Sequence, residues 1–194
     1  MTLKKLMNTA IIAMVIPVIT AAVFMPVISK FFYASANVET IGSAQIVSGA
    51  VTMFVSAVGC WSNGLKIFNK LYYPMFIADI AMAIIIAVLG VEHVEMRFYL
   101  NALQSALCGA VVEQSLNYYI MLVIPKEEIQ LFSNRIKTMT GGAGLVGSFL
   151  AVMLGDININ IALWVIVALT VSDFILSSFL RNEFKKLSEE KAQD

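Results

Sequence analysis

Charged residues are scarce in this chain of 194 residues: Asp, Glu, Lys and Arg make up 13% of it, against about a quarter of an ordinary globular domain. So few charges cannot cover the surface of a soluble protein that is 59% hydrophobic. The 13 Lys and Arg balance the 13 Asp and Glu, so no excess positive charge is available to bind nucleic acid. Two Cys and one His provide neither a disulfide framework nor a clustered zinc site, and we expect no metal and no cofactor. These absences indicate an integral membrane protein that lies in the lipid bilayer.

Long apolar runs are what the sequence has instead. A helix that crosses a bilayer needs roughly 20 mostly apolar residues. The runs predict an all-α, polytopic membrane protein whose six spanning helices lie at about 8–32, 41–63, 71–91, 98–124, 138–157 and 158–180. The first run is too long for a cleavable signal, so we expect it to be retained. The chain 1–194 is then a single six-helix domain, and its charged, solvated tail at 181–194 begins as a continuation of the last helix.

The positions of Lys and Arg predict the orientation. Eleven of them fall on one side of the predicted spans, whereas only Lys30 and Arg97 fall on the other. Because cytoplasmic loops carry the excess of basic residues, both termini are expected in the cytoplasm. The predicted location is the cell (inner) membrane, which the chain crosses several times.

Glycine is concentrated in the second and fifth predicted spans, and it lets membrane helices approach closely. These two spans occupy equivalent positions if the bundle consists of two inverted three-helix repeats. We therefore expect them to contact a second subunit. The alternative is that they only pack within their own bundle. The glycines predicted at the interface are Gly49, Gly141, Gly144 and Gly147.

Three acidic residues lie within the predicted spans, where an ionised carboxylate costs at least ~2.5–3.5 kcal/mol at the helix centre. The first candidate is Glu113, which shares a helix face with Asn117 on the most polar of the spans. Gln104 lies on the same span and is a candidate neutral ligand beside Glu113. We expect this helix to face water or a partner, with Glu113 binding a cation or a cationic part of a substrate. The alternative is a protonated carboxyl bonded to a neighbouring helix.

The other two acidic residues are weaker candidates. Asp79 lies at mid-depth in the third span, where a structural hydrogen bond and the binding of a coupling ion are equally compatible with the sequence. Asp173 lies closer to the cytoplasmic end of the last span, and we expect it either to reach toward the membrane interface or to bond a nearby hydroxyl such as that of Ser177.

Several stretches, in the same order along the chain, resemble one half of a transporter of the major facilitator superfamily. They are Phe24–Val27, Phe32–Tyr33, Ile41–Ala44, Gly59–Gly64 with Lys66 and Lys70, Leu103–Ser105, Pro125–Arg135 and Gly141–Gly155. The contexts of Pro74 and Asn134 are similar to those of the cation-coupled sugar-transporter branch. Asn63, Asn101 and Ser148 stand where the family usually has Asp, Arg and, in antiporters, Pro, and the departures at Asn101 and Ser148 argue against proton-driven export.

The resemblance implies a function. Such transporters normally have twelve helices, and their first and fourth helices line the cavity, which fits the polarity around Glu113. A six-helix chain then implies a half-size secondary transporter of a small solute, working by alternating access as a homodimer or with a second half-transporter. The alternatives are a non-transporting protein that binds or regulates a partner transporter, which Asn63 favours, and a subunit of a multi-protein importer. No pattern of nucleophile and base is present, so we expect no enzyme.

Overall fold

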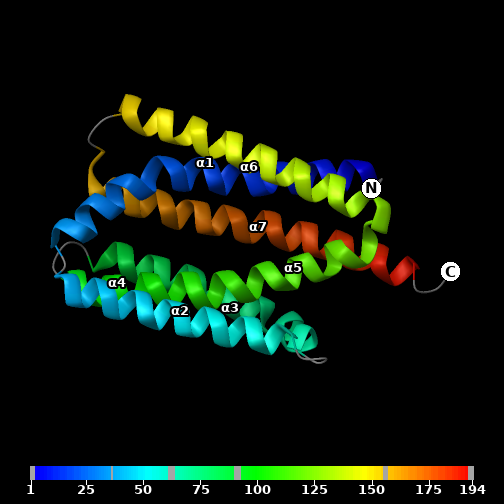
Figure 1. Cartoon of the computed structure of the whole chain (residues 1–194), viewed down its shortest axis with the longest axis horizontal. Coiled ribbons are helices and arrows are strands. Elements are labelled where there is room, and N and C mark those ends of the chain that lie inside the picture. Colours follow the sequence, from blue (N-terminus) through cyan, green and yellow to red (C-terminus); the bar gives the residue numbers. More distant parts are fainter. Residues whose placement is uncertain (1–2, 36, 61–63, 90–92, 155–156, 192–194) are drawn as a thin grey trace. The chain divides into compact units, whose positions relative to one another are not determined.

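The computed structural model describes residues 3–35, 37–60, 64–89, 93–154 and 157–191. Within these ranges all regular secondary structure is helical (Figure 1). The elements are α1 (Leu3–Ser35), α2 (Val38–Cys60), α3 (Gly64–Val88), α4 (Val94–Leu103), the π-helix η1 (Gln104–Gly109), α5 (Ala110–Val123), α6 (Lys126–Leu154) and α7 (Ile159–Lys191). The all-α prediction is confirmed.

Four helices of the described part are long and apolar enough to cross a membrane. They are α2, α3, α6 and α7, with candidate spans at Val38–Gly59, Lys66–Val88, Lys126–Met153 and Ile159–Lys191. These helices identify the chain as a membrane protein. The fourth predicted span is helical from 98 to 123 but is not one α-helix, because η1 separates α4 from α5.

Short polar segments begin the helices. Asn37 precedes α2, and its side-chain Oδ1 accepts a hydrogen bond from the backbone N–H of Thr40 at 2.7 Å. Pro125 precedes α6, whose first turn contains Glu127 and Glu128 at the positive end of the helix dipole. Asn158 precedes α7 and accepts from the backbone N–H of Asn160 at 2.9 Å. Helix N-termini leave backbone N–H groups without intrahelical acceptors, and these oxygens provide them.

The helices form two compact units. Unit 1 comprises Met1–Pro26, Leu116–Asp156 and Val171–Asp194, and unit 2 comprises Val27–Ser115 and Ile157–Thr170. The single six-helix domain stays a prediction.

The core of unit 1 combines apolar residues from α1, α5, α6 and α7. Its fully or almost fully buried members include Leu6, Ala10, Ile120, Leu180 and Phe184. α7 continues to Lys191, well beyond the predicted end of its span at 180. The expectation of a solvated tail is wrong for Phe184, which is fully buried, because its side chain completes this core.

Polar groups hold the end of α7 to α5 within unit 1. The guanidinium of Arg181 lies 5.3 Å from the centre of the Tyr119 ring, a cation–π contact. Lys191 Nζ donates to the carbonyl oxygen of Val123, the last residue of α5, at 2.7 Å. A cation is favourable there because the last carbonyls of a helix lack intrahelical donors.

Unit 2 packs α2, α3, α4 and η1 together. Its buried apolar cluster consists of Val55, Phe68 and Val111, with partly buried neighbours on α2, α3 and η1. Gly59 lies where α2 approaches α5, because a Cβ at this position would collide with the side-chain oxygen of Gln114. The absence of a side chain at Gly59 thus leaves room for the Gln114 side chain.

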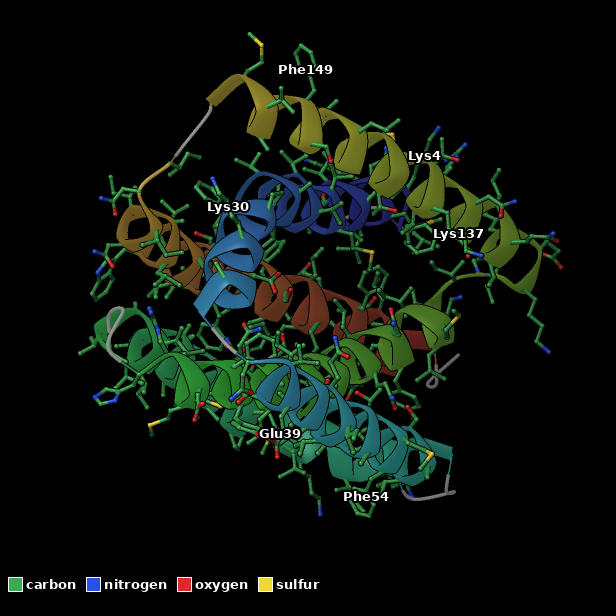
Figure 2. The ribbon with its side chains drawn as sticks, turned by 60° about the vertical axis from the view of Figure 1, so that its left-hand side comes forward. Lys4, Lys30, Glu39, Phe54, Lys137 and Phe149 are labelled. Atoms are coloured by element: carbon green, nitrogen blue, oxygen red, sulfur yellow. The ribbon has the colours of Figure 1, made fainter. Side chains whose placement is uncertain are left out.

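Large apolar side chains also cover the outside of the helices. Phe54 on α2 and Phe149 on α6 are 68% and 64% exposed and point outward from their helices (Figure 2). Such exposure suits a bilayer, in which lipid tails cover apolar side chains without cost.

Candidate functional site

Asp79 and Gln104, two of the residues selected from the sequence, are bonded to each other. Gln104 Nε2 donates to the Asp79 carboxylate Oδ1 at 2.7 Å and lies 3.2 Å from the backbone oxygen of the same residue. Both side chains are half-buried in unit 2. The sequence left open whether Asp79 forms a structural bond or binds an ion, and the structure shows the bond.

The apolar helix around this pair determines what the pair can bind. Asp79 lies within α3, a helix long and apolar enough to span a membrane. A carboxylate in such a helix is costly, and a hydrogen bond from an amide offsets part of that cost. Carboxylate and amide oxygens are also the ligands that small hard cations prefer. Because the Gln104 amide N–H now donates to Asp79 Oδ1, a cation that binds this oxygen has to displace it.

Gln104 is also the first residue of η1. π turns are rare in proteins and frequently occur at functional sites. Farther along the chain, Ser115 lies in α5 and is fully buried. Its Oγ donates to the side-chain Oδ1 of Asn69 on α3 at 2.7 Å. One polar bond to α3 thus starts from the first residue of η1, and a second starts from α5, beyond the last residue of η1.

A third polar contact joins α4 to α3. Arg97 is fully buried, and its Nε and Nη2 donate to the carbonyl oxygen of Ile86 at 3.1 and 2.9 Å. Ile86 lies in the last turn of α3, where the helix dipole favours a cation. Sequence reasoning used Arg97 only for orientation. The signal that could have found it is a lone Arg next to an apolar span, close behind the end of the previous helix.

Polar contacts also join α4 to α2 near the same end of unit 2. Thr40 Oγ1 lies 3.4 Å from Glu95 Oε1, and the hydroxyls of Ser43 and Tyr99 share a short hydrogen bond. These contacts position α4, so that Gln104 at its end reaches Asp79.

Glu113, the leading candidate from the sequence, lies in α5, but its side chain falls outside the described residues. Its role in cation binding stays a prediction. Asn117, its expected neighbour, is half-buried in α5 and belongs to unit 1, whereas Asp79 and Gln104 belong to unit 2. The described geometry therefore brings together two of the four predicted ligands.

Of the two alternatives for Asp173, the bond to a nearby hydroxyl is observed. Ser177 Oγ donates to Asp173 Oδ1 at 2.9 Å, one turn along α7. This carboxylate is bonded within its own helix and is not part of the Asp79 site.

The four interface glycines differ in their surroundings. Among the described residues, no atom lies within 4 Å of a Cβ placed on Gly49, Gly141 or Gly144. A Cβ on Gly147 would lie 2.5 Å from the backbone oxygen of Ile19 and 2.6 Å from the Cβ of Ala22, both on α1. The prediction for Gly147 needs correction, because this glycine contacts a helix of its own chain. The other three positions are open, and their place at a dimer interface stays a prediction.

Among the described residues, no three His, Cys, Asp or Glu side chains gather as a metal site requires. The candidate site is thus a single carboxylate with its amide partner. No family model, curated protein or solved structure matches the chain, so its function has to be argued from Asp79, Gln104 and the helices that hold them.

Proposed function

We propose that the chain is a half-size secondary transporter of a small solute, coupled to a cation that binds at Asp79. The observation that supports this most is the bond between Asp79 and Gln104. It places a carboxylate inside an apolar helix next to a π turn, so that charge and an irregular backbone occur together. Discontinuous helices beside a membrane-embedded charge are the usual construction of ion and substrate sites in secondary transporters.

The proposed topology has six spans. α1 and the run from α4 to α5 join the four candidate spans as the first and fourth, and both termini lie in the cytoplasm. A dimer would supply the second half of the cavity, and alternating access would come from rocking of the two bundles. The open positions at Gly49, Gly141 and Gly144 allow a partner helix to approach closely.

The second candidate function is a six-helix protein that binds or regulates a partner transporter. The sequence supports it through Asn63, which replaces an acidic residue of the cytoplasmic signature in the resembled family. The two functions differ in one measurable property, because only the transporter moves solute when it is reconstituted alone.

Asp79→Asn should abolish the cation dependence of uptake while the protein still folds. The amide keeps the size of the side chain and an oxygen that can accept from Gln104, but it removes the negative charge that binds a cation. The measurement is uptake of candidate solutes into vesicles with and without a Na⁺ or proton gradient. We expect the stimulation by the gradient to fall at least tenfold in the variant.

Asp173→Asn is the matched control, because Asp173 is bonded only one turn along its own helix. This control should keep the response of the wild type. Equal gradient dependence in Asp79→Asn and the wild type would remove Asp79 from the proposal and leave Glu113, tested by Glu113→Gln, as the coupling residue. Absence of uptake by the wild-type protein alone would favour the regulatory function.

The topology gives a separate prediction. Single cysteines at Asn37, His93 and Asn158, all exposed, should react with an impermeant thiol reagent added outside intact cells. A cysteine at Gln130, exposed near the start of α6, should react only after the membrane is opened. The experiment starts from a chain whose native cysteines are replaced. Labelling of Gln130 from outside would reverse the proposed orientation.

A further inference from the structure

Three polar bonds fix the register between α3 and the antiparallel run that comprises α4, η1 and α5. Arg97 bonds Ile86, and Gln104 bonds Asp79. Seven positions separate the two residues on the run, and seven positions also separate their partners on α3. Equal spacing is what two regular α-helices require, because each residue adds about 1.5 Å of rise and about 100° of rotation.

The next interval does not match. Gln104 and Ser115 are eleven positions apart on the run, whereas their partners Asp79 and Asn69 are only ten apart on α3. The run therefore contains one residue more than α3 between these bonds. η1 occupies this interval, and a π turn holds more residues per turn than an α turn. The π turn takes up the additional residue, so that both bonds can form.

The position of that residue depends on Gln104. As long as the outer bonds at Arg97 and Ser115 hold, one additional residue has to lie somewhere between them. The bond from Gln104 to Asp79 decides on which side of Gln104 it lies, and it now lies on the side of η1. If this bond is released, the π turn can move toward α4 without breaking either outer bond.

We infer that the π turn is a movable element, locked in η1 by Gln104 and released when a cation takes the carboxylate of Asp79. When the π turn moves, position 105 comes opposite Asp79 and Gln104 rotates away by about 100°, which is one residue of helix. A side chain near this point is displaced by about 8 Å on a helix of about 10 Å diameter. The cation step rests on the proposed function, whereas the register argument rests only on the three bonds.

Coupling follows from competition for one atom. Gln104 Nε2 and a cation both need Oδ1 of Asp79, so a cation bound there favours the shifted π turn, and the shifted turn in return favours cation binding. Movement of a π turn changes which face of the fourth helix meets α2 and α3, against which η1 packs. This is how a small ion could alter helix packing through a change confined to one stretch of the fourth helix.

Amide hydrogen exchange resolved to single residues tests this inference in the full-length protein in detergent or nanodiscs. We expect the fastest amides within the run at 104–109 in the wild type without Na⁺, because the hydrogen bonds of a π turn are weaker. In Gln104→Leu the fast amides should extend to 98–103, with rates there raised at least tenfold. Gln45→Leu, the same change at an exposed position of α2, should leave the pattern unchanged.

A second variant keeps the test decisive if Gln104→Leu folds poorly. Deletion of Leu107 removes one residue from η1, so the run and α3 have equal spacing and all three bonds can form on regular α-helices. The fast amides at 104–109 should then disappear. Persistence of fast exchange there in the deletion variant, or an unchanged pattern in a folded Gln104→Leu, overturns the inference.

Repeating the exchange experiment with different cations tests the movable π turn and the proposed cation site separately. NaCl is compared with choline chloride at one pH, and Asp79→Leu, which removes the acceptor, shows the fully released state. A shift toward 98–103 with Na⁺ supports the cation step with Na⁺ as the ion, and the same shift on acidification alone, after correction for intrinsic exchange, supports a proton. If Gln104→Leu moves the π turn but neither cation does, the movable turn stands and the cation site at Asp79 falls. If the exchange pattern never moves but Asp79→Asn loses gradient dependence, the cation site stands and the movable turn falls.

Discussion

Gly147→Leu should destabilise unit 1 by more than about 3 kcal/mol and remove most of the folded protein from detergent extracts. A Cβ at this position would lie 2.5 Å from the backbone oxygen of Ile19 on α1. Because the atom in the way is backbone, the helices have to separate, and α6 loses its close contact with α1. The measurement is the fraction of monodisperse protein in size-exclusion chromatography, together with the midpoint of thermal unfolding.

Gly142→Leu is the matched control on the same helix. Gly142 is exposed, and within the described part of the chain no atom lies within 4 Å of a Cβ built there. This variant should fold like the wild type. If Gly147→Leu also folds normally but changes only the oligomeric state, the contact with α1 is not essential and the original assignment of Gly147 to a subunit interface returns.

The sequence predicted the helical class because long apolar runs can be recognised along the chain without knowledge of tertiary contacts. It placed the ends of helices less well, because whether a charged segment continues a helix depends on tertiary packing. α7 shows this: the run of charges after Leu180 indicated a solvated tail, but Phe184 is buried in the core of unit 1 and the helix continues to Lys191. The burial of the Phe184 side chain therefore favours a packed helix here, although charged residues surround Phe184 in the sequence.

The sequence predicted the residues of the candidate site but not the bond between them. Asp79 and Gln104 stood out because polar groups are rare in apolar spans. Their bond depends on the register between two helices, which no local pattern encodes. The π turn was missed for the same reason, since an additional residue is visible only when the run is compared with its partner helix. By contrast, the bond between Ser177 and Asp173 is confined to one helix turn, and spacing alone was enough to name it as one of two alternatives.

Arg97→Ala should be the most damaging substitution in unit 2, with a loss of roughly 3 kcal/mol. Arg97 is fully buried and donates two hydrogen bonds to the carbonyl oxygen of Ile86, so alanine leaves both a cavity and an unsatisfied acceptor. Arg97→Lys keeps the charge but lacks the two N–H groups that donate to one oxygen, and its loss of stability should be about half as large. Arg135→Ala, the same change at an exposed position of α6, should have little effect.

The same variant also tests the register argument. Arg97 provides one of the two outer bonds that confine the additional residue of the fourth run, but the bonds of Gln104 and Ser115 still enclose that residue when Arg97 alone is lost. We therefore expect Arg97→Ala, at temperatures where it is folded, to keep the fast-exchanging amides at 104–109, whereas the double variant Arg97→Ala/Gln104→Leu should lose them. The readouts are thermal unfolding followed by tryptophan fluorescence and amide exchange on one sample. A stability equal to that of Arg135→Ala would show that the bonds to Ile86 do not hold α4, and the confinement of the π turn would then need another source.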